Sequence, residues 1–156
     1  MTLADDRDAI RDVFARYCLY FDSGRGAECA VLFTEDGTFD TRMGDPVVGR
    51  TALAAMVNAN PPGLTHHWIT NFVIDVDGDQ ATCVASAMVM SKGVILMTAH
   101  THDELQRVDG EWRIKFRTYE PDPHDIDSVS GDDVAVAEER LAEFQRRGGW
   151  RTGGTR

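Results

Sequence analysis

Apolar residues near the start of the chain recur at helical spacing and predict an amphipathic helix. The residues of its apolar face lie three or four positions apart and are Ile10, Val13, Phe14, Tyr17, Cys18 and Phe21. Thr2, followed three residues later by Asp5, has the form of a capping box, so the helix should begin there. The run Asp22-Ser23-Gly24 should end it. Tyr17 is therefore expected on the buried face and Asp22 at the C-terminal end.

Breaks in the pattern divide the next part of the chain into shorter elements. We predict a helix over residues 27–33, a brief strand over 38–41 and a third helix over 51–58. Residues 44–49 read as a loop or a short hairpin. Pro61-Pro62-Gly63 ends this region, because proline cannot continue a helix.

From Leu64 onward, β-branched and apolar runs alternate with turn dipeptides and predict a sheet. The turns are Asp77-Gly78, Lys92-Gly93 and Asp109-Gly110. They separate four strands, at residues 65–76, 80–91, 94–107 and 111–119. Helices followed by such an antiparallel meander are typical of an α+β domain, in which about three helices cover one face of a curved sheet.

The chain has 156 residues, which fits one domain. We assign residues 1–120 to that domain and expect residues 121–156 to form a loop, a helix and a tail packed on it. The helix should run from Asp132 or Asp133 to about Arg147. Its apolar stripe is formed by Val134, Ala137, Leu141 and Phe144.

The strand at 65–76 has two largely apolar faces. One is formed by Thr65, His67, Ile69, Asn71 and Val73. The other is formed by His66, Trp68, Thr70, Phe72, Ile74 and Val76. Because helices can cover only the first face, we expect a homo-oligomer, a dimer or trimer, that packs through the second face. Alternatively, the C-terminal helix folds over that face, or a bulge changes the register.

The charge and composition of the chain exclude several partners. Its formal net charge is −10 at pH 7, which repels nucleic acid and anionic membrane surfaces, so we expect neither as a partner. The sequence shows no apolar run of membrane-spanning length and no signal peptide, which favours a cytoplasmic protein. Cys18, Cys29 and Cys83 are irregularly spaced in apolar surroundings, as is typical of reduced, buried thiols.

Candidate chemistry centres on His67 and Asp22. A neutral imidazole held by a carboxylate is a common general base near pH 7. Each residue also has an ordinary interpretation, as a hydrogen-bonded core histidine or as a turn former. Tyr17 could polarise a substrate carbonyl or bond a backbone carbonyl in the core. Arg117 could bind an oxyanion or carboxylate, or pair with glutamate on an exposed strand.

His100 and His102 lie two residues apart in a predicted strand and so point the same way. They could bind a metal or line the cavity as additional acids. Two further metal ligands at matching spacing are not evident, so we expect no metal and no cofactor.

Small and flexible side chains along the central strands predict an apolar pocket. They are Ala81, Cys83, Ala85, Ala87, Met88, Met90 and Met97. With Phe14, Phe21 and Phe39 they suggest space for a ring-containing small molecule, such as a steroid, terpenoid, aromatic or polyketide. The alternative is a tightly packed core in which methionine fills the gaps.

Several motifs together resemble the SnoaL-like branch of the NTF2-like superfamily, over about residues 5–119. They are the three helices, the Phe33–Gly37 break, the Gly49-Arg50 step, the His67–Asn71 strand and the Asp109–Ile114 hairpin. The resemblance implies a cone-shaped α+β barrel. Such barrels carry dehydratases, isomerases, cyclases, a dehydrochlorinase and non-catalytic subunits, so the fold does not define the reaction.

The resemblance also implies roles for single residues. Enzymes of this branch that eliminate water or HCl use an aspartate at the end of the first helix and a histidine in the first long strand, which Asp22 and His67 match. Asn71 and Arg117 match positions of the dehydrochlorinase-like members. Tyr17 replaces their lysine and matches a bile-acid-dehydratase-like member, which favours loss or movement of an oxygen function.

We therefore expect a cofactor-independent lyase or isomerase in which His67 removes a proton from carbon and Asp22 orients it. Tyr17 and Arg117 would handle the charge that develops on oxygen. The residues expected to contact the substrate are Phe14, Phe21, Thr65, Asn71, Met88, His100 and His102. The alternative is a non-catalytic small-molecule-binding protein or an accessory subunit of the same fold, such as the small subunits of ring-hydroxylating dioxygenases.

Overall fold

The computed structural model describes residues 2–122 and has the predicted order of helices and strands. Its helices are α1 (Leu3–Asp22), α2 (Gly26–Ala30) and α3 (Arg50–Ala59). Its strands are β1 (Phe33–Asp40), β2 (Val47–Val48), β3 (His66–Asp77), β4 (Gln80–Ser91), β5 (Val94–Val108) and β6 (Glu111–Pro121). The α+β class is thus confirmed. The helix expected from Asp132 or Asp133 lies outside the described residues. The division of the chain at residue 120 stays a prediction.

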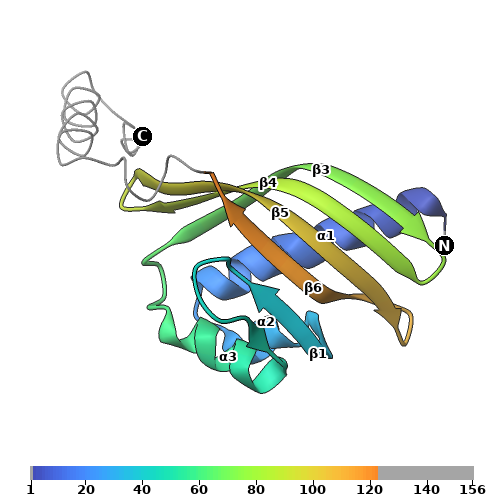
Figure 1. Cartoon of the computed structure of the whole chain (residues 1–156), viewed down its shortest axis with the longest axis horizontal. Coiled ribbons are helices and arrows are strands. Elements are labelled where there is room, and N and C mark those ends of the chain that lie inside the picture. Colours follow the sequence, from blue (N-terminus) through green and yellow to red (C-terminus); the bar gives the residue numbers. More distant parts are fainter. Residues whose placement is uncertain (1, 123–156) are drawn as a thin grey trace, which may run out of the picture.

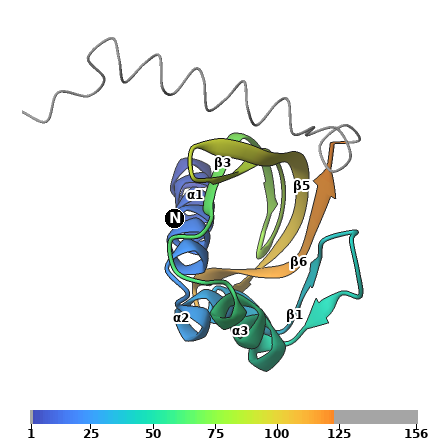
Figure 2. The same cartoon turned by 90° about the vertical axis from the view of Figure 1, so that its left-hand side faces the viewer.

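A single curved sheet with the strand order β2-β1-β6-β5-β4-β3 forms most of the structure (Figure 1). The meander from β3 to β6 is antiparallel, as predicted, whereas β1 joins β6 in parallel. The sheet bends around α1 but does not close on itself. In Figure 2 the strands curve from β3 to β1, and α1 and α3 cover the side that they leave open.

Helix α1 begins with the predicted capping box and is tied to the sheet near the same end. Thr2 N–H donates to Asp5 Oδ2 at 2.7 Å, and Asp5 N–H donates to Thr2 Oγ1 at 3.2 Å. One turn in, the buried carboxylate of Asp6 accepts hydrogen bonds from Arg107 at 2.7 Å and from the Trp112 indole at 3.2 Å. These bonds fix the start of α1 against β5 and β6.

Strand β1 begins earlier than predicted, at Phe33 rather than residue 38. The Thr34–Gly37 segment, interpreted as a break, is a bulge within this strand, because the pairing with β6 shifts between Phe33 and Thr38. A Cβ on Gly37 would lie 2.8 Å from Phe33 Cβ, so only glycine fits this close approach. The turn-forming residues thus bend β1 at this bulge, but they do not end an element there.

A second bulge, in β3, changes which residues face the interior. Asn71 has a φ of 57°, and the pairing with β4 shifts between Thr70 and Val73. After the bulge, Phe72, Ile74 and Val76 pack into the core, while Val73 is 63% exposed. The prediction that Phe72, Ile74 and Val76 share the outer face with Trp68 was therefore wrong. The homo-oligomer stays a prediction, now with Trp68 and Val73 as the exposed apolar residues of β3.

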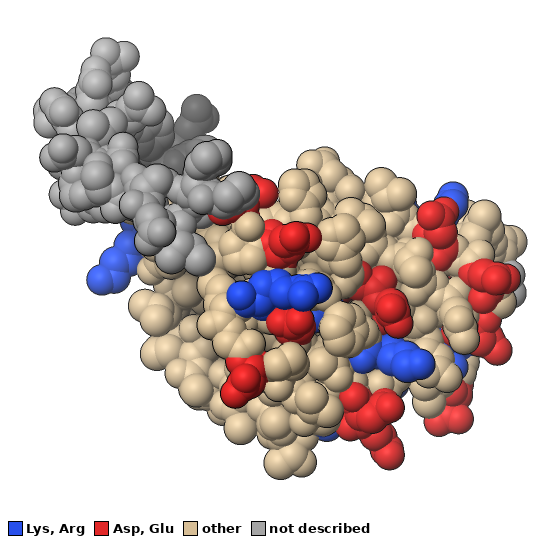
Figure 3. Space-filling view, in the orientation of Figure 1, with Lys and Arg blue, Asp and Glu red and all other residues tan. Residues whose placement is uncertain are grey.

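Three further expectations concern the surface charge, the cysteines and the length of the helices. Figure 3 shows acidic and basic side chains interspersed over the strand-bearing face, without a continuous basic patch in this view. Cys18, Cys29 and Cys83 are free and buried, as expected. Within residues 2–122, no helix has the length and apolar content needed to cross a bilayer.

The bulge makes a direct prediction about position 71. Asn71→Val should lower the free energy of unfolding by about 1–2 kcal/mol, because a β-branched residue is strained in the left-handed region. Asn71→Gly should stay within about 0.5 kcal/mol of the parent. Urea unfolding measures both, and Thr70→Val, a change to the same residue at the preceding position, is the control. Equal losses for the two valine variants would contradict a left-handed requirement at Asn71.

Candidate functional site

An apolar cavity of about 190 Å³ lies between the concave side of the sheet and the C-terminal half of α1. Most of its wall is aromatic or sulfur-containing, including Phe21, Phe39, Met43, Met56 and Met97. The polar side chains that reach it include Tyr17, His67, Arg117 and Tyr119. An apolar wall with few polar groups is typical of a site for a small organic ligand.

Asp22 and His67 form a closely bonded pair at one wall of this cavity. His67 Nδ1 lies 2.5 Å from Asp22 Oδ1, and the His67 backbone N–H donates to Asp22 Oδ2 at 2.9 Å. The His67 side chain is only 16% exposed and the Asp22 side chain only 14%. One carboxylate thus holds both the main chain and the ring of His67, which assigns the proton of the neutral ring to Nδ1 and leaves Nε2 to act as a base.

The chain folds so that these two residues meet although 45 positions separate them. Asp22 is the last residue of α1, where the helix dipole disfavours a negative charge. The loop that leads into β3 returns to this end, because Gly63 N–H donates to the Asp22 carbonyl at 2.8 Å. His67 is the second residue of β3 and so follows directly. Hydrogen bonds from His67 offset the unfavourable position of the carboxylate.

Arg117, on β6, also belongs to the cavity wall and is fully buried, so the alternative of an exposed strand arginine was wrong. Its Nη1 donates to Asp103 Oδ1 at 3.1 Å, and Asp103 is also fully buried. The guanidinium carbon lies 4.5 Å from the centre of the Tyr17 ring and 5.1 Å from that of Phe14. Burial raises the pKa of Asp103, and the neighbouring Arg117 opposes that rise.

Tyr17 contributes a hydroxyl that stays protonated. Burial raises its pKa far above the ordinary value, although the positive charge of Arg117 acts in the opposite direction. The ring packs against Phe21, Phe33 and Phe39, with centroids 5.7 to 6.4 Å apart. A tyrosine held in this way can donate a hydrogen bond into the cavity but cannot carry a negative charge at neutral pH.

The structure brings together Asp22, His67, Tyr17, Arg117 and Phe21 from the expected site residues. It does not bring the other expected contacts to the cavity. Phe14 lies behind Arg117 and stacks on Phe72 at 5.8 Å. Thr65 accepts a hydrogen bond from Asn60 at 3.2 Å outside the cavity wall.

Four of the expected contacts face the outside of the sheet, so the prediction that they line the cavity was wrong. They are Asn71, Met88, His100 and His102. Asn71 is exposed at the bulge, where it bonds Ser86. Met88 alternates with the inward-facing Ala87 and Val89. His100 and His102 alternate with buried Ala99, Thr101 and Asp103, so their side chains are 58% and 53% exposed.

The two outer-face histidines each lie beside a carboxylate. His100 Nδ1 lies 3.5 Å from Asp122 Oδ1, and His102 Nε2 lies 3.6 Å from Glu120 Oε2. Among residues 2–122, no group of three or more histidine, cysteine or acidic side chains has a geometry that could hold a metal ion. The expectation that no metal or cofactor is needed stays a prediction.

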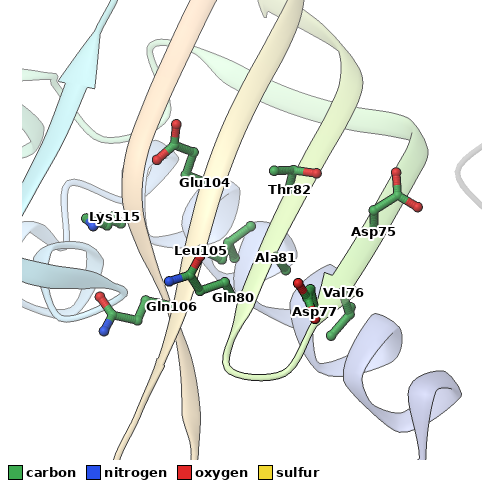
Figure 4. Close-up of a pocket in the computed structure, with 10 residues that line it drawn as sticks. All are labelled: Asp75, Val76, Asp77, Gln80, Ala81, Thr82, Glu104, Leu105, Gln106 and Lys115. Carbon is green, nitrogen blue, oxygen red and sulfur yellow. The ribbon is translucent and has the colours of Figure 1, made fainter.

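A second hollow of about 260 Å³ lies at the other end of β4 and β5 (Figure 4). Its side chains are mostly polar and come from several strands, among them Asp75, Thr82, Glu104, Gln106 and Lys115. It contains neither an aromatic side chain nor a histidine. It therefore lacks the combination of apolar wall and proton-transfer group that the Asp22–His67 cavity has.

Among the residues that sequence reasoning did not assign to the Asp22–His67 cavity are two inward-facing polar ones, Tyr119 in the wall and Asp103 behind it. Asp103 follows Ala99 and Thr101 at two-residue spacing, and Tyr119 follows Arg117 in the same way. The alternation within each strand was the available signal. A charged residue at an inward position is unusual, since it needs a buried partner.

Comparison with known proteins identifies the fold. A model of the SnoaL-like domain matches residues 2–118. A variant of Rv3472, a protein of unknown function from Mycobacterium tuberculosis, is 30% identical, with a TM-score of 0.73 over 94% of this chain and 95% of that chain. No curated protein gives a match.

Two structures from Novosphingobium aromaticivorans are also similar in fold. An NTF2-like protein with a cystatin-like fold is 24% identical, with a TM-score of 0.69 over 86% of this chain and 90% of that chain. A candidate scytalone dehydratase is 21% identical, with a TM-score of 0.66 over 76% of this chain and 85% of that chain. These likenesses confirm the expected fold and leave the reaction open.

The geometry of the pair predicts the tautomer of His67. At a pH where the ring is neutral, we expect the proton on Nδ1, because Asp22 accepts it there. Asp22→Asn should lose this fixed tautomer, since its amide can donate as well as accept. Ring ¹⁵N chemical shifts measure the population, with free histidine in the same buffer as the reference. A neutral ring protonated mainly on Nε2 in the parent protein would contradict the arrangement.

Proposed function

Because the chain belongs to the SnoaL-like domain family, we propose that it is a cofactor-independent lyase or isomerase that acts on a small, apolar, ring-containing molecule. The observation that carries this proposal is the double contact of Asp22 with His67, at 2.5 and 2.9 Å, in the wall of an apolar cavity. A packed core histidine would not need a carboxylate on both its ring and its backbone.

In the proposed first step, His67 Nε2 removes a proton from a carbon atom of the substrate next to a carbonyl group. The electron pair of the C–H bond moves onto the carbonyl oxygen and forms an enolate, while His67 becomes an imidazolium. Asp22 keeps the ring oriented and stabilises its positive charge. A positioned general base of this kind typically accelerates such a step by about 10² to 10⁴.

Tyr17 and Arg117 would stabilise the oxygen on which negative charge develops. Tyr17 stays protonated and can donate, since burial raises its pKa. Arg117 is held at the cavity wall by Asp103 and by the faces of two aromatic rings. Donors fixed in an apolar cavity stabilise developing charge better than water does, because they need not reorient.

The proton on His67 then decides the product. Transfer to a leaving hydroxyl releases water and completes an elimination, whereas return to another carbon completes an isomerisation. A candidate scytalone dehydratase has the same fold and its name corresponds to the first outcome, but the fold alone does not decide between the two. A protein that only binds such molecules, as an accessory subunit would, is the competing function.

Proton removal can be tested without the natural substrate. In D₂O, the protein should accelerate exchange of the C–H protons next to the carbonyl of 2-tetralone, a bicyclic ketone, measured by NMR. His67→Gln should slow the protein-dependent exchange by about 10²- to 10⁴-fold. Asp22→Asn should lose most of the same activity, and the double variant should be no more than about threefold slower than His67→Gln.

His66→Gln is the matched control for this experiment. His66 precedes His67 in β3, but its side chain is 57% exposed and its Nδ1 lies 3.9 Å from Asp22. Exchange should survive in this variant and after treatment with a chelator. Ketone binding without any exchange would favour the accessory binding protein, and losses that multiply in the double variant would contradict a cooperating pair.

A further inference from the structure

Arg117 and Asp103 form a buried ion pair of one positive and one negative charge next to the cavity. The two residues lie directly opposite each other on β6 and β5, and each faces the interior. A single hydrogen bond of 3.1 Å joins Arg117 Nη1 to Asp103 Oδ1. Both side chains are removed from water, which cannot solvate their charges. Each residue therefore needs the other as its countercharge.

Part of this pair remains without hydrogen bonds. Arg117 Nε and Nη2 are buried and meet no partner among the described residues, whereas the Asp103 carboxylate also lies beside the Thr101 hydroxyl. Arg117 forms part of the cavity wall, whereas Asp103 stands behind it. Because Arg117 belongs to the cavity wall, a ligand oxygen that reaches these two guanidinium nitrogens would satisfy them, while Asp103 keeps the guanidinium in place.

The charges around the cavity leave no surplus for an anion. Arg117 is the single residue with a permanent charge among the described residues of the wall, and Asp103 cancels it. Asp22 adds one negative charge beside His67. The set is thus negative by one charge with a neutral His67 and uncharged with a protonated one.

We infer that this cavity selects uncharged ligands that carry a carbonyl or hydroxyl oxygen, and that Asp103 is the residue that sets this preference. A carboxylate-bearing ligand would bring a second negative charge into an apolar site. A neutral ligand meets the free N–H groups of Arg117 without that cost. The inference deepens the proposed function by naming the substrate class, and it takes from that function only the use of this cavity.

The same arrangement fits proton transfer from a neutral substrate. When His67 takes a proton from such a ligand, one negative charge appears on the ligand and one positive charge on His67, so the total is unchanged. The negative charge then lies at the Arg117 wall and the positive charge beside Asp22. Asp103 acts through Arg117 and touches no substrate, so it is a positioning residue.

A matched pair of ligands tests the preference. Acetophenone and benzoate share one ring and nearly the same size, but at pH 7 only benzoate is charged. Isothermal titration of the full chain should give a dissociation constant at least about tenfold lower for acetophenone, a modest difference in binding free energy. Equal or tighter binding of benzoate by the parent protein would overturn the inference.

Asp103→Asn tests the source of the preference. This change removes the countercharge of Arg117 with little change of shape, so benzoate should gain at least about tenfold relative to acetophenone. Benzoate should also raise the melting temperature of this variant more than that of the parent, because it supplies the missing countercharge. Glu104→Gln removes the same charge from the outer face of the same strand and should leave the ratio unchanged.

A double variant keeps the test valid if Asp103→Asn alone fails to fold. Asp103→Asn combined with Arg117→Gln removes both charges of the pair, which buried pairs tolerate better than the loss of one partner. It should retain the parent preference for acetophenone, because the local charge is the same. A preference for benzoate in the double variant, or an unchanged ratio in Asp103→Asn, would overturn the role of Asp103. Because binding is measured, loss of proton exchange alone would instead refute the proposed function.

Discussion

The contact of one carboxylate with two atoms of one residue joins the helical part of this protein to its sheet at the cavity. Asp22 is the last residue of α1, and His67 lies near the start of β3. The Asp22 carboxylate accepts a hydrogen bond from the backbone N–H of His67 and lies against the ring of the same residue. A shift of the helix end relative to the strand would break both contacts together. The position of the proposed base is therefore set by the packing of α1, and not only by a side-chain rotamer.

The interior is divided along α1 into a packed part, against its first half, and an open part, against its second half. Near its start and middle, Ile10 and Phe14 fill the concave side together with Phe72 and Ile74. Arg117 lies at the border, with Phe14 and Tyr17 against its guanidinium. The bulge at Asn71 serves the same division, because it lets β3 present His67 and Ile69 to the cavity and Ile74 to the packed core.

Much of the fold could be predicted from the sequence, since helical spacing and the turns Lys92-Gly93 and Asp109-Gly110 are local signals. The pairing of Asp22 with His67 is not local, and its prediction rested on the resemblance to a known family. The register between neighbouring strands could not be predicted in this way, because it depends on bulges and not on local residue patterns. Continuing the pairing of Leu105 with Ile114 would place Asp103 opposite Phe116, and a shift between Glu104 and Leu105 places it opposite Arg117. The bulge at Asn71 similarly reversed the faces of Phe72 and Ile74. Met88 differs, because its alternation with Ala87 already indicated the outer face.

The Arg117–Asp103 pair links the stability of the fold to the contents of the cavity. A buried polar group without a partner costs about 1 to 3 kcal/mol, which is large against the roughly 5 to 15 kcal/mol that stabilise a whole domain. Such a cost is offset when a molecule in the cavity accepts from the guanidinium. The groups that would recognise a ligand oxygen are thus the groups that the protein alone leaves unsatisfied, so ligand binding and folding should reinforce each other at this wall.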